Sequence, residues 1–533
     1  MLSVISIEYA QQNLIMKFFI PTTLANLAGL VLLLLVNTQD VHAENYRADQ
    51  NKTELLERRI YELERRLEKL ETLTSLLQPP QNTVQNEANV KELTNEVHVL
   101  EQKFDTQEEL IQNNAKKTPI IEAGDSGFKI SSADKKHQVR LRGIVQADNR
   151  TFTEDNSKST DSFDLKQARI WFEGRVFNDV YFKISPNFAS GSDILPDAYL
   201  DYAYHSAASL LVGKFKPALS LERLQGDTDG TFLERAFPAY LATNRDVGME
   251  LHGGFNFTGQ SAEKVVGPID TKNQFSYQFG IFNGSGDEGN LNNNAADVND
   301  NKEFVGRLFA HPFQHSDYSW LEGLGIGVAG SYAHPLNLAL NNQRTPIGRN
   351  SYLNYASTFT NATGSAFAAP VSNGDSYRIY PQAYWYAGSF GAMAEYVVSS
   401  QHLAGMNKTG ALNIKQDNTA WQILGSYILT GENSSFGSVK PSRAFNPMEN
   451  TWGALQIAAR WSQLDVDSDT FLLIDPSKSA RQARAWTVGA NWYLNANALI
   501  RADYEQVSFD GGAAKGGNRP TEQLFATRFQ LAF

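Results

Sequence analysis

The chain has 533 residues, of which 42% are hydrophobic and 20% are charged, and it contains no cysteine. A chain without cysteine has no disulfide scaffold, no thiolate metal site and no cysteine nucleophile. The 47 basic residues are outnumbered by 58 acidic ones, which gives a formal charge of -11 and argues against nucleic acid as a partner. The low overall hydropathy excludes a bundle of apolar membrane helices, but it does not exclude a membrane β-barrel, whose strands are only half apolar.

The N-terminus has the pattern of a secretory signal. Lys17 supplies a positive charge, an apolar run extends from Leu30 to Val36, and Val41-His42-Ala43 offers small residues to a signal peptidase. The alternative is a membrane-anchoring helix, but the apolar core is short for one. We therefore predict a signal peptide over residues 1–43 and an exported protein, with Met1 and Met16 both candidate starts.

Residues 44–118 carry the strong helical signal of the chain. Two stripes of mostly apolar residues recur with spacings of three and four. The first consists of Leu56, Ile60, Leu63, Leu67, Leu70, Thr74 and Leu77, and the second of Val90, Leu93, Val97, Leu100, Phe104 and Ile111. Because a narrow heptad stripe buries one seam between helices, we predict a self-associating coiled coil of unspecified strand number. The alternative is a single amphipathic helix packed on a domain.

From Pro119 onward, stretches of about ten residues alternate apolar and polar side chains between segments rich in Gly, Asn, Asp and Ser. Side chains of a strand point alternately to its two faces, so Val139 and Leu141 share one face while Arg140 and Arg142 share the other. Further strands are predicted over residues 167–176, 197–204, 275–282, 304–310, 325–332, 376–386, 390–398, 421–429, 455–461, 485–493, 499–507 and 525–533.

A soluble sandwich also alternates, but three features favour one closed membrane barrel. The alternation runs for roughly 400 residues without a helix, which suits about sixteen strands. Aromatic clusters such as Tyr384-Trp385-Tyr386 stand near strand ends, where membrane interfaces need them. The last strand ends on Phe533, which resembles the signal read by the outer-membrane assembly machinery. We therefore predict an all-β fold, a transmembrane antiparallel β-barrel over residues 119–533, preceded by the short α-helical coiled coil.

Short motifs in this region resemble the phosphate-selective porins of the O and P type. In chain order they include Gly127-Phe128-Lys129-Ile130, Val145-Gln146-Ala147-Asp148, Ala168-Arg169-Ile170-Trp171-Phe172-Glu173-Gly174, Asp197-Ala198-Tyr199, Leu233-Glu234-Arg235, Asp246-Val247-Gly248, Ala394-Glu395-Tyr396 and Val488-Gly489-Ala490-Asn491-Trp492-Tyr493. Each motif is short, but the ordered run from about residue 125 to residue 533 is specific. The resemblance implies a sixteen-stranded outer-membrane homotrimer that passes phosphate or polyphosphate through a lumen lined by arginine and lysine.

Basic residues of the early strands are the candidate substrate-binding residues. They are Arg140, Arg142, Lys166, Arg169, Arg175 and Lys183. Phosphate sheds water when it enters a narrow pore, and guanidinium groups replace part of its hydration with forked donors and fixed charge. The alternative for each residue is structural, because an arginine beside Glu173 or Asp201 would neutralise a carboxylate of the wall instead.

Three departures from the family pattern weaken the case for strict phosphate selectivity. Lys166-Gln167 stands where phosphate-selective members show an arginine pair, and Ile144 where they show an arginine. The segment Gly226 to Gly230 is acidic where a phosphate trap would carry lysine. After residue 118 the chain has 35 basic and 41 acidic residues, so the barrel is not cationic as a whole. We predict an anion preference rather than strict phosphate selectivity.

Other motif matches have a structural interpretation. Gly325 to Gly330 matches a dinucleotide fingerprint, but the pattern continues as a strand rather than opening a helix. Asp465, Asp467 and Asp469 fit a solvated turn better than a calcium loop. The polar stretches 290–300 and 341–374 are long loops of the kind that can fold into a barrel and narrow it. No catalytic motif is present, so we expect no enzyme, no cofactor and no metal site.

These features predict an outer-membrane porin of a Gram-negative-type envelope that lets small anions diffuse through a water-filled channel, with the coiled coil in the periplasm. Its expected partners are small anions, outer-membrane lipid, two further copies of the chain and the assembly machinery. The alternative function is a structural or adhesive protein that the barrel merely anchors.

Overall fold

The fold is described from a computed structural model. The described residues are 91, 95–96, 98–99, 102–110, 117–124, 127–153, 159–189, 194–257, 261–267, 269–284 and 300–533. They fall into two units, Met1–Leu110 and Ile111–Phe533.

The described residues of the first unit are helical. Phe104, a residue of the second heptad stripe, lies in this helix and is 54% exposed. The helix agrees with the predicted character of the segment, whereas the coiled coil stays a prediction. The predicted signal peptide and the first heptad stripe lie outside the described residues. Within the described residues, no helix is both long enough and apolar enough to cross a membrane.

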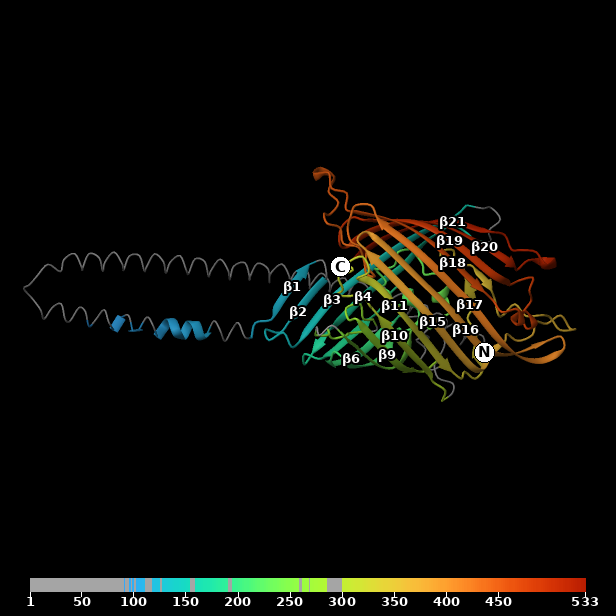
Figure 1. Cartoon of the computed structure of the whole chain (residues 1–533), viewed down its shortest axis with the longest axis horizontal. Coiled ribbons are helices and arrows are strands. Elements are labelled where there is room, and N and C mark those ends of the chain that lie inside the picture. Colours follow the sequence, from blue (N-terminus) through green and yellow to red (C-terminus); the bar gives the residue numbers. More distant parts are fainter. Residues whose placement is uncertain are drawn as a thin grey trace, which may run out of the picture. The chain divides into compact units, whose positions relative to one another are not determined.

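The second unit contains a closed antiparallel barrel, and its described residues form a ring of sixteen strands (Figure 1). In chain order these are β3 (Gln138–Phe152), β4 (Ser162–Val176), β5 (Val180–Ser185), β6 (Asp197–His205), β7 (Ala208–Phe215), β8 (Asp246–Phe255), β9 (Phe275–Phe282), β10 (Glu303–Ala310), β11 (Gly323–Ala333), β15 (Val371–Ala387), β16 (Phe390–Asn407), β17 (Gly410–Ile428), β18 (Ala454–Asp465), β19 (Ala480–Tyr493), β20 (Ala498–Gly511) and β21 (Glu522–Ala532). The ring closes where β21 pairs with β3, with Arg528 opposite Asp148. The predicted all-β barrel of about sixteen strands is confirmed.

Most predicted strands are present, commonly with wider bounds. The pattern of Gly325 to Gly330 lies within β11, as predicted. The sequence pattern misses β5, β7 and β8, which have 6, 8 and 10 residues. Length alone does not explain this, since the predicted strands β9 and β10 also have 8 residues each. In β7, the consecutive apolar residues Leu210, Leu211 and Val212 hide the alternation, because Leu211 is apolar yet fully buried on the inner face.

The two faces of the wall differ as the alternation predicts. On β3, Val139 and Val145 point outward and are 45% and 44% exposed, whereas Gln146, Asp148 and Arg150 are buried on the inner face. Outside, the indoles of Trp385 and Trp492 donate to the backbone oxygens of Trp320 and Trp452, both at 2.7 Å. Apolar residues outward, polar residues inward and aromatic residues at strand ends are what a membrane barrel requires.

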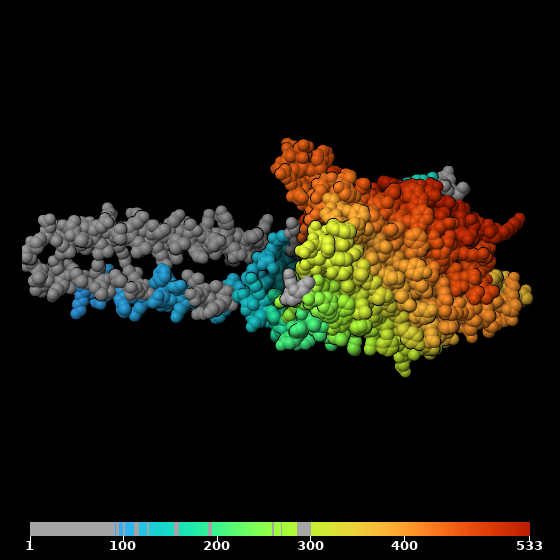
Figure 2. Space-filling model, viewed as in Figure 1, coloured from blue at the N-terminus to red at the C-terminus, as the bar shows by residue number. Residues whose placement is uncertain are grey.

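A two-stranded hairpin extends the wall beside the start of β3. It consists of β1 (Ile120–Gly124) and β2 (Gly127–Ser131), and β2 pairs with Gln138 to Leu141 of β3. Gly127 has a φ of 91°, a conformation that glycine adopts without a side-chain clash. Figure 2 shows this part of the chain, coloured blue to cyan, at the surface at one end of the barrel.

Two loops fold into the barrel and supply an internal core. The loop of residues 216–245 carries two short helices, α3 (Leu221–Leu224) and α4 (Phe237–Tyr240), and most of its apolar residues are fully buried. The loop between β11 and β15 contains β12 (Leu338–Ala339), β13 (Gln343–Arg344) and β14 (Ser351–Leu353). Tyr352 of this loop packs against Phe237 of α4 and Phe509 of β20, with ring centroids 5.7 and 5.9 Å away.

The sequence pattern predicts that the stretches 290–300 and 341–374 can fold into the barrel, and the inward loops can be compared with this prediction. The stretch 341–374 does fold inward in part, since Ile347 N donates to Glu505 of β20 at 2.8 Å. Most of the stretch 290–300 lies outside the described residues. The more deeply buried loop, residues 216–245, is not the one singled out by the sequence pattern.

Candidate functional site in the barrel lumen

Local capping and packing shape the loop of residues 216–245. The hydroxyl of Ser220 accepts from Arg223 N at 3.3 Å and caps α3, and Pro238 stands in the first turn of α4, where its missing N–H costs nothing. Leu219, Phe237 and Leu241 pack together in the internal core. These local contacts contribute to fixing the conformation of the loop.

Wall residues hold this loop from several strands. Glu395 of β16 accepts from Leu221 N at 2.9 Å, and Asp503 of β20 accepts from Leu233 N at 2.7 Å. Arg460 of β18 donates to Glu222 at 3.1 Å. Buried charges need such partners, because an unpaired buried charge is strongly destabilising. Much of the polar inner wall thus serves to fix the loop across the lumen.

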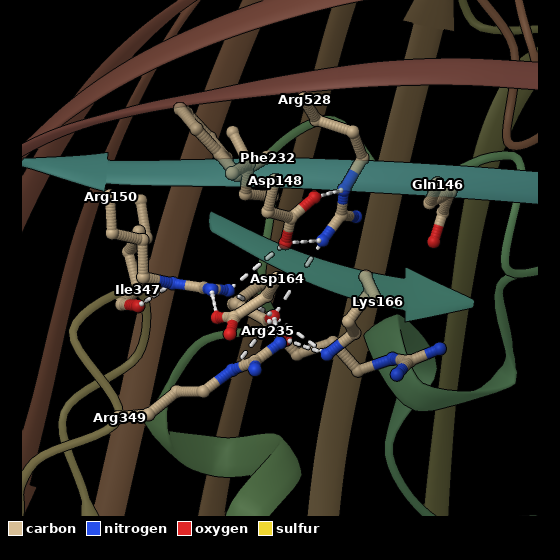
Figure 3. A network of polar contacts seen from close by, with 12 residues as sticks. Gln146, Asp148, Arg150, Asp164, Lys166, Phe232, Arg235, Ile347, Arg349 and Arg528 are labelled. Atoms are coloured by element: carbon tan, nitrogen blue, oxygen red, sulfur yellow. Dashed lines mark hydrogen bonds and ion pairs between the residues drawn. The ribbon is translucent and has the colours of Figure 1, made fainter. Parts of the chain in front are cut away.

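Glu234 of the loop is surrounded by four cations, Lys166, Arg150, Arg349 and Arg528, which Figure 3 labels within one network of polar contacts. Lys166 Nζ lies 2.7 Å and 2.9 Å from its two carboxylate oxygens. Arg349 contacts the same carboxylate through Nε at 3.1 Å, while Arg150 and Arg528 approach it to 3.3 and 3.7 Å. Burial would raise the pKa of Glu234, but Arg349, Lys166 and Arg528 hold it well below its usual value of 4.5. The carboxylate is thus ionised throughout the physiological pH range.

Asp148 and Asp164 complete this network from the wall. Arg528 donates to both oxygens of Asp148 at 2.6 and 2.8 Å, and Arg150 donates to Asp148 at 3.0 Å and also contacts Asp164. Arg150 Nε in addition donates to the backbone oxygen of Ile347 at 2.9 Å. The strands β3, β4 and β21 are thereby joined to both inward loops.

Asp227, a second loop carboxylate, is surrounded in the same way. Arg169 of β4 contacts it directly, and Arg235 and Arg245 lie 3.4 and 3.8 Å from it. Burial would raise the pKa of Asp227, but Arg169 and its basic neighbours hold it well below its usual range. Arg245 also donates to Asp197 at 2.7 Å. The acidic loop that the sequence shows is therefore not a source of free negative charge at Asp227.

The two clusters together carry an excess of positive charge. Within the described residues, seven basic side chains lie within 4 Å of five carboxylates: Arg150, Lys166, Arg169, Arg235, Arg245, Arg349 and Arg528 against Asp148, Asp164, Asp197, Asp227 and Glu234. Three of the cations keep solvent exposure, with Lys166 at 25%, Arg235 at 30% and Arg349 at 34% of the side chain. Positive charge is therefore accessible beside the loop.

Two of the six predicted binding residues, Lys166 and Arg169, contact carboxylates of the inward loop. The other four contact other groups. Arg140 and Arg142 lie 3.8 and 3.4 Å from Glu173 and keep about a third of their side-chain surface exposed. Lys183 lies 6.0 Å from the ring centroid of Trp171. Arg175 donates to Lys135 O at 3.0 Å, next to a turn, and stands apart from the loop.

Strict alternation misplaces Lys166. It would put Lys166 on the outer face with Ala168, two residues further on. A register shift occurs between Gln146 and Ala147 of the partner strand β3, where Gln146 pairs with Gln167 and Ala147 with Leu165. This bulge leaves Lys166 without a direct partner and turns its side chain into the lumen.

Several lumen cations escape the sequence reasoning. Arg150 and Arg528 lie on the polar faces of β3 and β21. Extending the alternation of side chains along these two strands would therefore have placed both side chains in the lumen. Arg235, Arg245 and Arg349 stand in or beside loops, where no period exists. Only the folded structure brings them to the wall. In the part of the chain that the structure describes, no three His, Asp or Glu side chains converge as metal ligands would.

Comparison with known proteins identifies relatives of the barrel. Residues 139–533 match the profile of the family described as phosphate-selective porin O and P. Porin O of Pseudomonas aeruginosa is 21% identical over 452 residues, which cover 78% of this chain and 92% of that protein. Similar solved structures include the outer membrane channel DcaP of Acinetobacter baumannii, with 10% identity, 76% and 100% coverage and a TM-score of 0.44. The anion-selective porin from Comamonas acidovorans shows 10% identity, 74% and 100% coverage and a TM-score of 0.39.

Proposed function

Because the chain belongs to the family of phosphate-selective porins O and P, we propose that its barrel is a water-filled pore through which small anions diffuse passively. Membership of this family makes the chain a channel protein of the outer membrane rather than an enzyme. Phosphate and polyphosphate are the candidate anions within the class that we propose.

The observation that carries this proposal is the local excess of cations over carboxylates in the two clusters around Glu234 and Asp227. Partly exposed Lys166, Arg235 and Arg349 lie beside the carboxylates of the inward loop. A fixed charge about 4 Å from an ion contributes roughly 1 kcal/mol in water and about 4 kcal/mol at an effective dielectric of 20. A small local excess thus sorts ions even though the whole chain is acidic.

Further cations extend the path along the inner face of β3. Arg140 and Arg142 stand two residues apart there and share Glu173 as their carboxylate. One carboxylate cannot neutralise two guanidinium groups. An anion that leaves the loop therefore meets a second region of positive charge, and weak successive sites favour passage over tight binding.

The observations favour a general anion pore over a phosphate-specific one. Many arginines already donate to protein carboxylates, as Arg528 does to Asp148, so few forked donors remain for a phosphate. Gln167, at the position of the second arginine of the family pattern, offers no charge. Passage of phosphate in this proposal depends on charge and size.

We further propose how the chain is exported and assembled. It would be exported by a signal peptide over residues 1–43, carry a coiled coil over residues 44–118 in the periplasm and, as the family resemblance implies, form a homotrimer. Phe533 N donates to Gly143 O at 2.9 Å, and Gly143 N donates to Phe533 O at 2.7 Å, so the terminal residue seals the barrel seam. This position suits a terminal strand that the assembly machinery presents for closure.

Reconstitution in a planar bilayer tests the proposal. Stepwise conductance is expected, and its absence would support the alternative of an anchored structural or adhesive protein. The reversal potential in a salt gradient should show anion preference, with both chloride and phosphate permeant. Equal or cation-favouring permeability would contradict the anion assignment while leaving the pore intact.

A further inference from the structure

A cavity lies between the two inward loops and the inner wall of the barrel, beside β10 and β15–β17. Glu303 of β10 and Arg378 of β15 line it from the wall, and Tyr240 and Tyr355 line it from the two loops. Its volume is about 90 Å³. A single water molecule needs roughly 10–15 Å³ of such space, so the cavity has room for several waters or for one small solute.

The two charged residues of the lining neutralise each other. Arg378 Nη1 donates to one oxygen of Glu303 at 2.7 Å, and the hydroxyl of Thr243 donates to the other oxygen at 3.0 Å. In the described part of the chain, every other residue that lines the cavity is uncharged. An ion that entered would lose its hydration without gaining a fixed countercharge, which is unfavourable. The cavity therefore favours a neutral solute, in contrast to the clusters around Glu234 and Asp227.

Several polar atoms of the lining residues have no hydrogen-bond partner within the described residues. They are the hydroxyl of Ser372, the side-chain oxygen of Gln343 and Nε of Arg378. Ser372 is 2% exposed and Gln343 is 7% exposed. Buried polar atoms nearly always have a partner, which is a protein group, a water or a ligand. The cavity beside these atoms offers the space for such a partner.

The lining also has an apolar part. Leu241 of the loop of residues 216–245 contributes to it, together with Leu338 and Leu340 of the loop between β11 and β15. A binding pocket typically combines apolar contact area with a few polar groups that fix the orientation of the ligand. Small polyols match this combination, because they carry C–H surface next to hydroxyls that both donate and accept hydrogen bonds.

We propose that this cavity binds a small neutral polyol of about the size of a monosaccharide. The polar contacts come from Ser372 of β15, Ser399 of β16 and Gln343 of the inward loop, all of which line the cavity. The inference goes beyond the anion pore and does not depend on it. The wall strands of the cavity, β10 and β15–β17, are not the strands β3, β4 and β21 that carry the Glu234 network.

Saturation-transfer NMR of the full-length protein in detergent, with ribose as the probe, tests this inference. Ser372→Ala and Ser399→Ala each remove one hydroxyl from the lining. Each should weaken ribose binding roughly two- to tenfold, the usual effect of losing one neutral hydrogen bond. Ser276→Ala is the matched control, because Ser276 is also 2% exposed with a hydroxyl that has no partner among the described residues, but it does not line the cavity.

Saturable ribose binding by the wild type and by Ser276→Ala, weakened in both cavity variants, is the expected result. No saturable binding would overturn the inference and leave water as the occupant of the cavity. Equal binding by all four proteins would also overturn it, since ribose would then bind elsewhere. Added sodium phosphate should not displace ribose, and displacement would assign the cavity to the anion path instead. None of these measurements uses conductance, so a failure of the anion pore in the bilayer is a separate result.

Discussion

Lys166 of β4 and Glu234 of the inward loop form a two-point contact, with Lys166 Nζ 2.7 Å from Oε1 and 2.9 Å from Oε2 of Glu234. The pair links the wall to the loop, and it also cancels the charge of a cation that is 25% exposed to the lumen. Glu234 thus lies where a permeating anion would be attracted. The loop carboxylate competes with the anion for the same cations.

Glu234→Gln should strengthen anion binding. The substitution keeps the size of the side chain but removes the negative charge beside Lys166 and Arg349. The loss of one repulsive charge at about 4 Å corresponds to roughly 1–4 kcal/mol, so the phosphate concentration that half-blocks the chloride current should fall about tenfold. A phosphate titration of single-channel current, with the reversal potential alongside, measures the effect.

Glu222→Gln is the matched control for this substitution. Glu222 stands on the same loop and pairs with Arg460 at 3.1 Å, away from Lys166. Both variants remove one loop carboxylate and one anchor to the wall. If the two variants bind phosphate equally well, the gain comes from a loosened loop, and the competition argument for Glu234 is wrong.

Arg349 and Arg528 should behave differently although both approach Glu234. The Arg349 side chain is 34% exposed, so Arg349→Ala is expected to lower the anion-to-cation permeability ratio with little loss of stability. The Arg528 side chain is 4% exposed and donates twice to Asp148. Arg528→Ala should destabilise the barrel by about 3 kcal/mol, because Asp148 would keep only Arg150.

Thermal denaturation in detergent and reversal potentials separate these two effects. A stable Arg528→Ala barrel would show that the Asp148 pair contributes no stability. An unchanged permeability ratio in Arg349→Ala would show that the exposed guanidinium does not face the ion path.

Periodic features of the sequence predict the wall, whereas the site depends on contacts that have no period. The strand pattern places Arg140 and Arg169 on the inner face correctly, since side chains alternate wherever the ladder is regular. It fails for Lys166, because a single bulge reverses the face. Arg235 and Arg349 come from loops, and only packing against the wall fixes where they lie. The carboxylate partners of these cations could not be deduced from spacing.

The depressed pKa of Glu234 predicts that this carboxylate stays charged across the physiological pH range. A carboxylate whose folded-state pKa lies below its unfolded value of 4.5 contributes stability above pH 4.5 and loses it as the pH falls through the folded value. Arg349 and Lys166 hold that folded value well below 4.5, so the charge of Glu234 and its anchoring of the loop should stay constant from pH 8 to pH 5. Reversal potentials of the wild type and of Glu234→Gln at several pH values test this, because the difference between the two proteins should not change in that range. A difference that disappears between pH 8 and pH 5 would show that Glu234 titrates there and that its ion pairs are weaker than the contacts indicate.

Arg460 is expected to control how rigidly the loop spans the lumen. Its side chain is fully buried, donates to Glu222 at 3.1 Å, lies 3.7 Å from Glu505 and stacks over Phe232 at 4.6 Å from the ring centroid. Arg460→Met keeps the volume but leaves two carboxylates without this cation, which costs about 3–5 kcal/mol when a buried pair is broken. The weakened anchor should lower the denaturation temperature and give a larger, noisier single-channel conductance.

Arg484→Met provides the comparison for Arg460→Met. Arg484 is exposed on β19, so its removal should leave conductance and stability unchanged. A quiet, wild-type conductance in Arg460→Met, despite reduced stability, would show that the remaining anchors at Glu395 and Asp503 are sufficient to hold the loop. In that case the width of the pore is set by the internal core that the two inward loops form around Phe237 and Tyr352, which Phe237→Ala would then be expected to loosen.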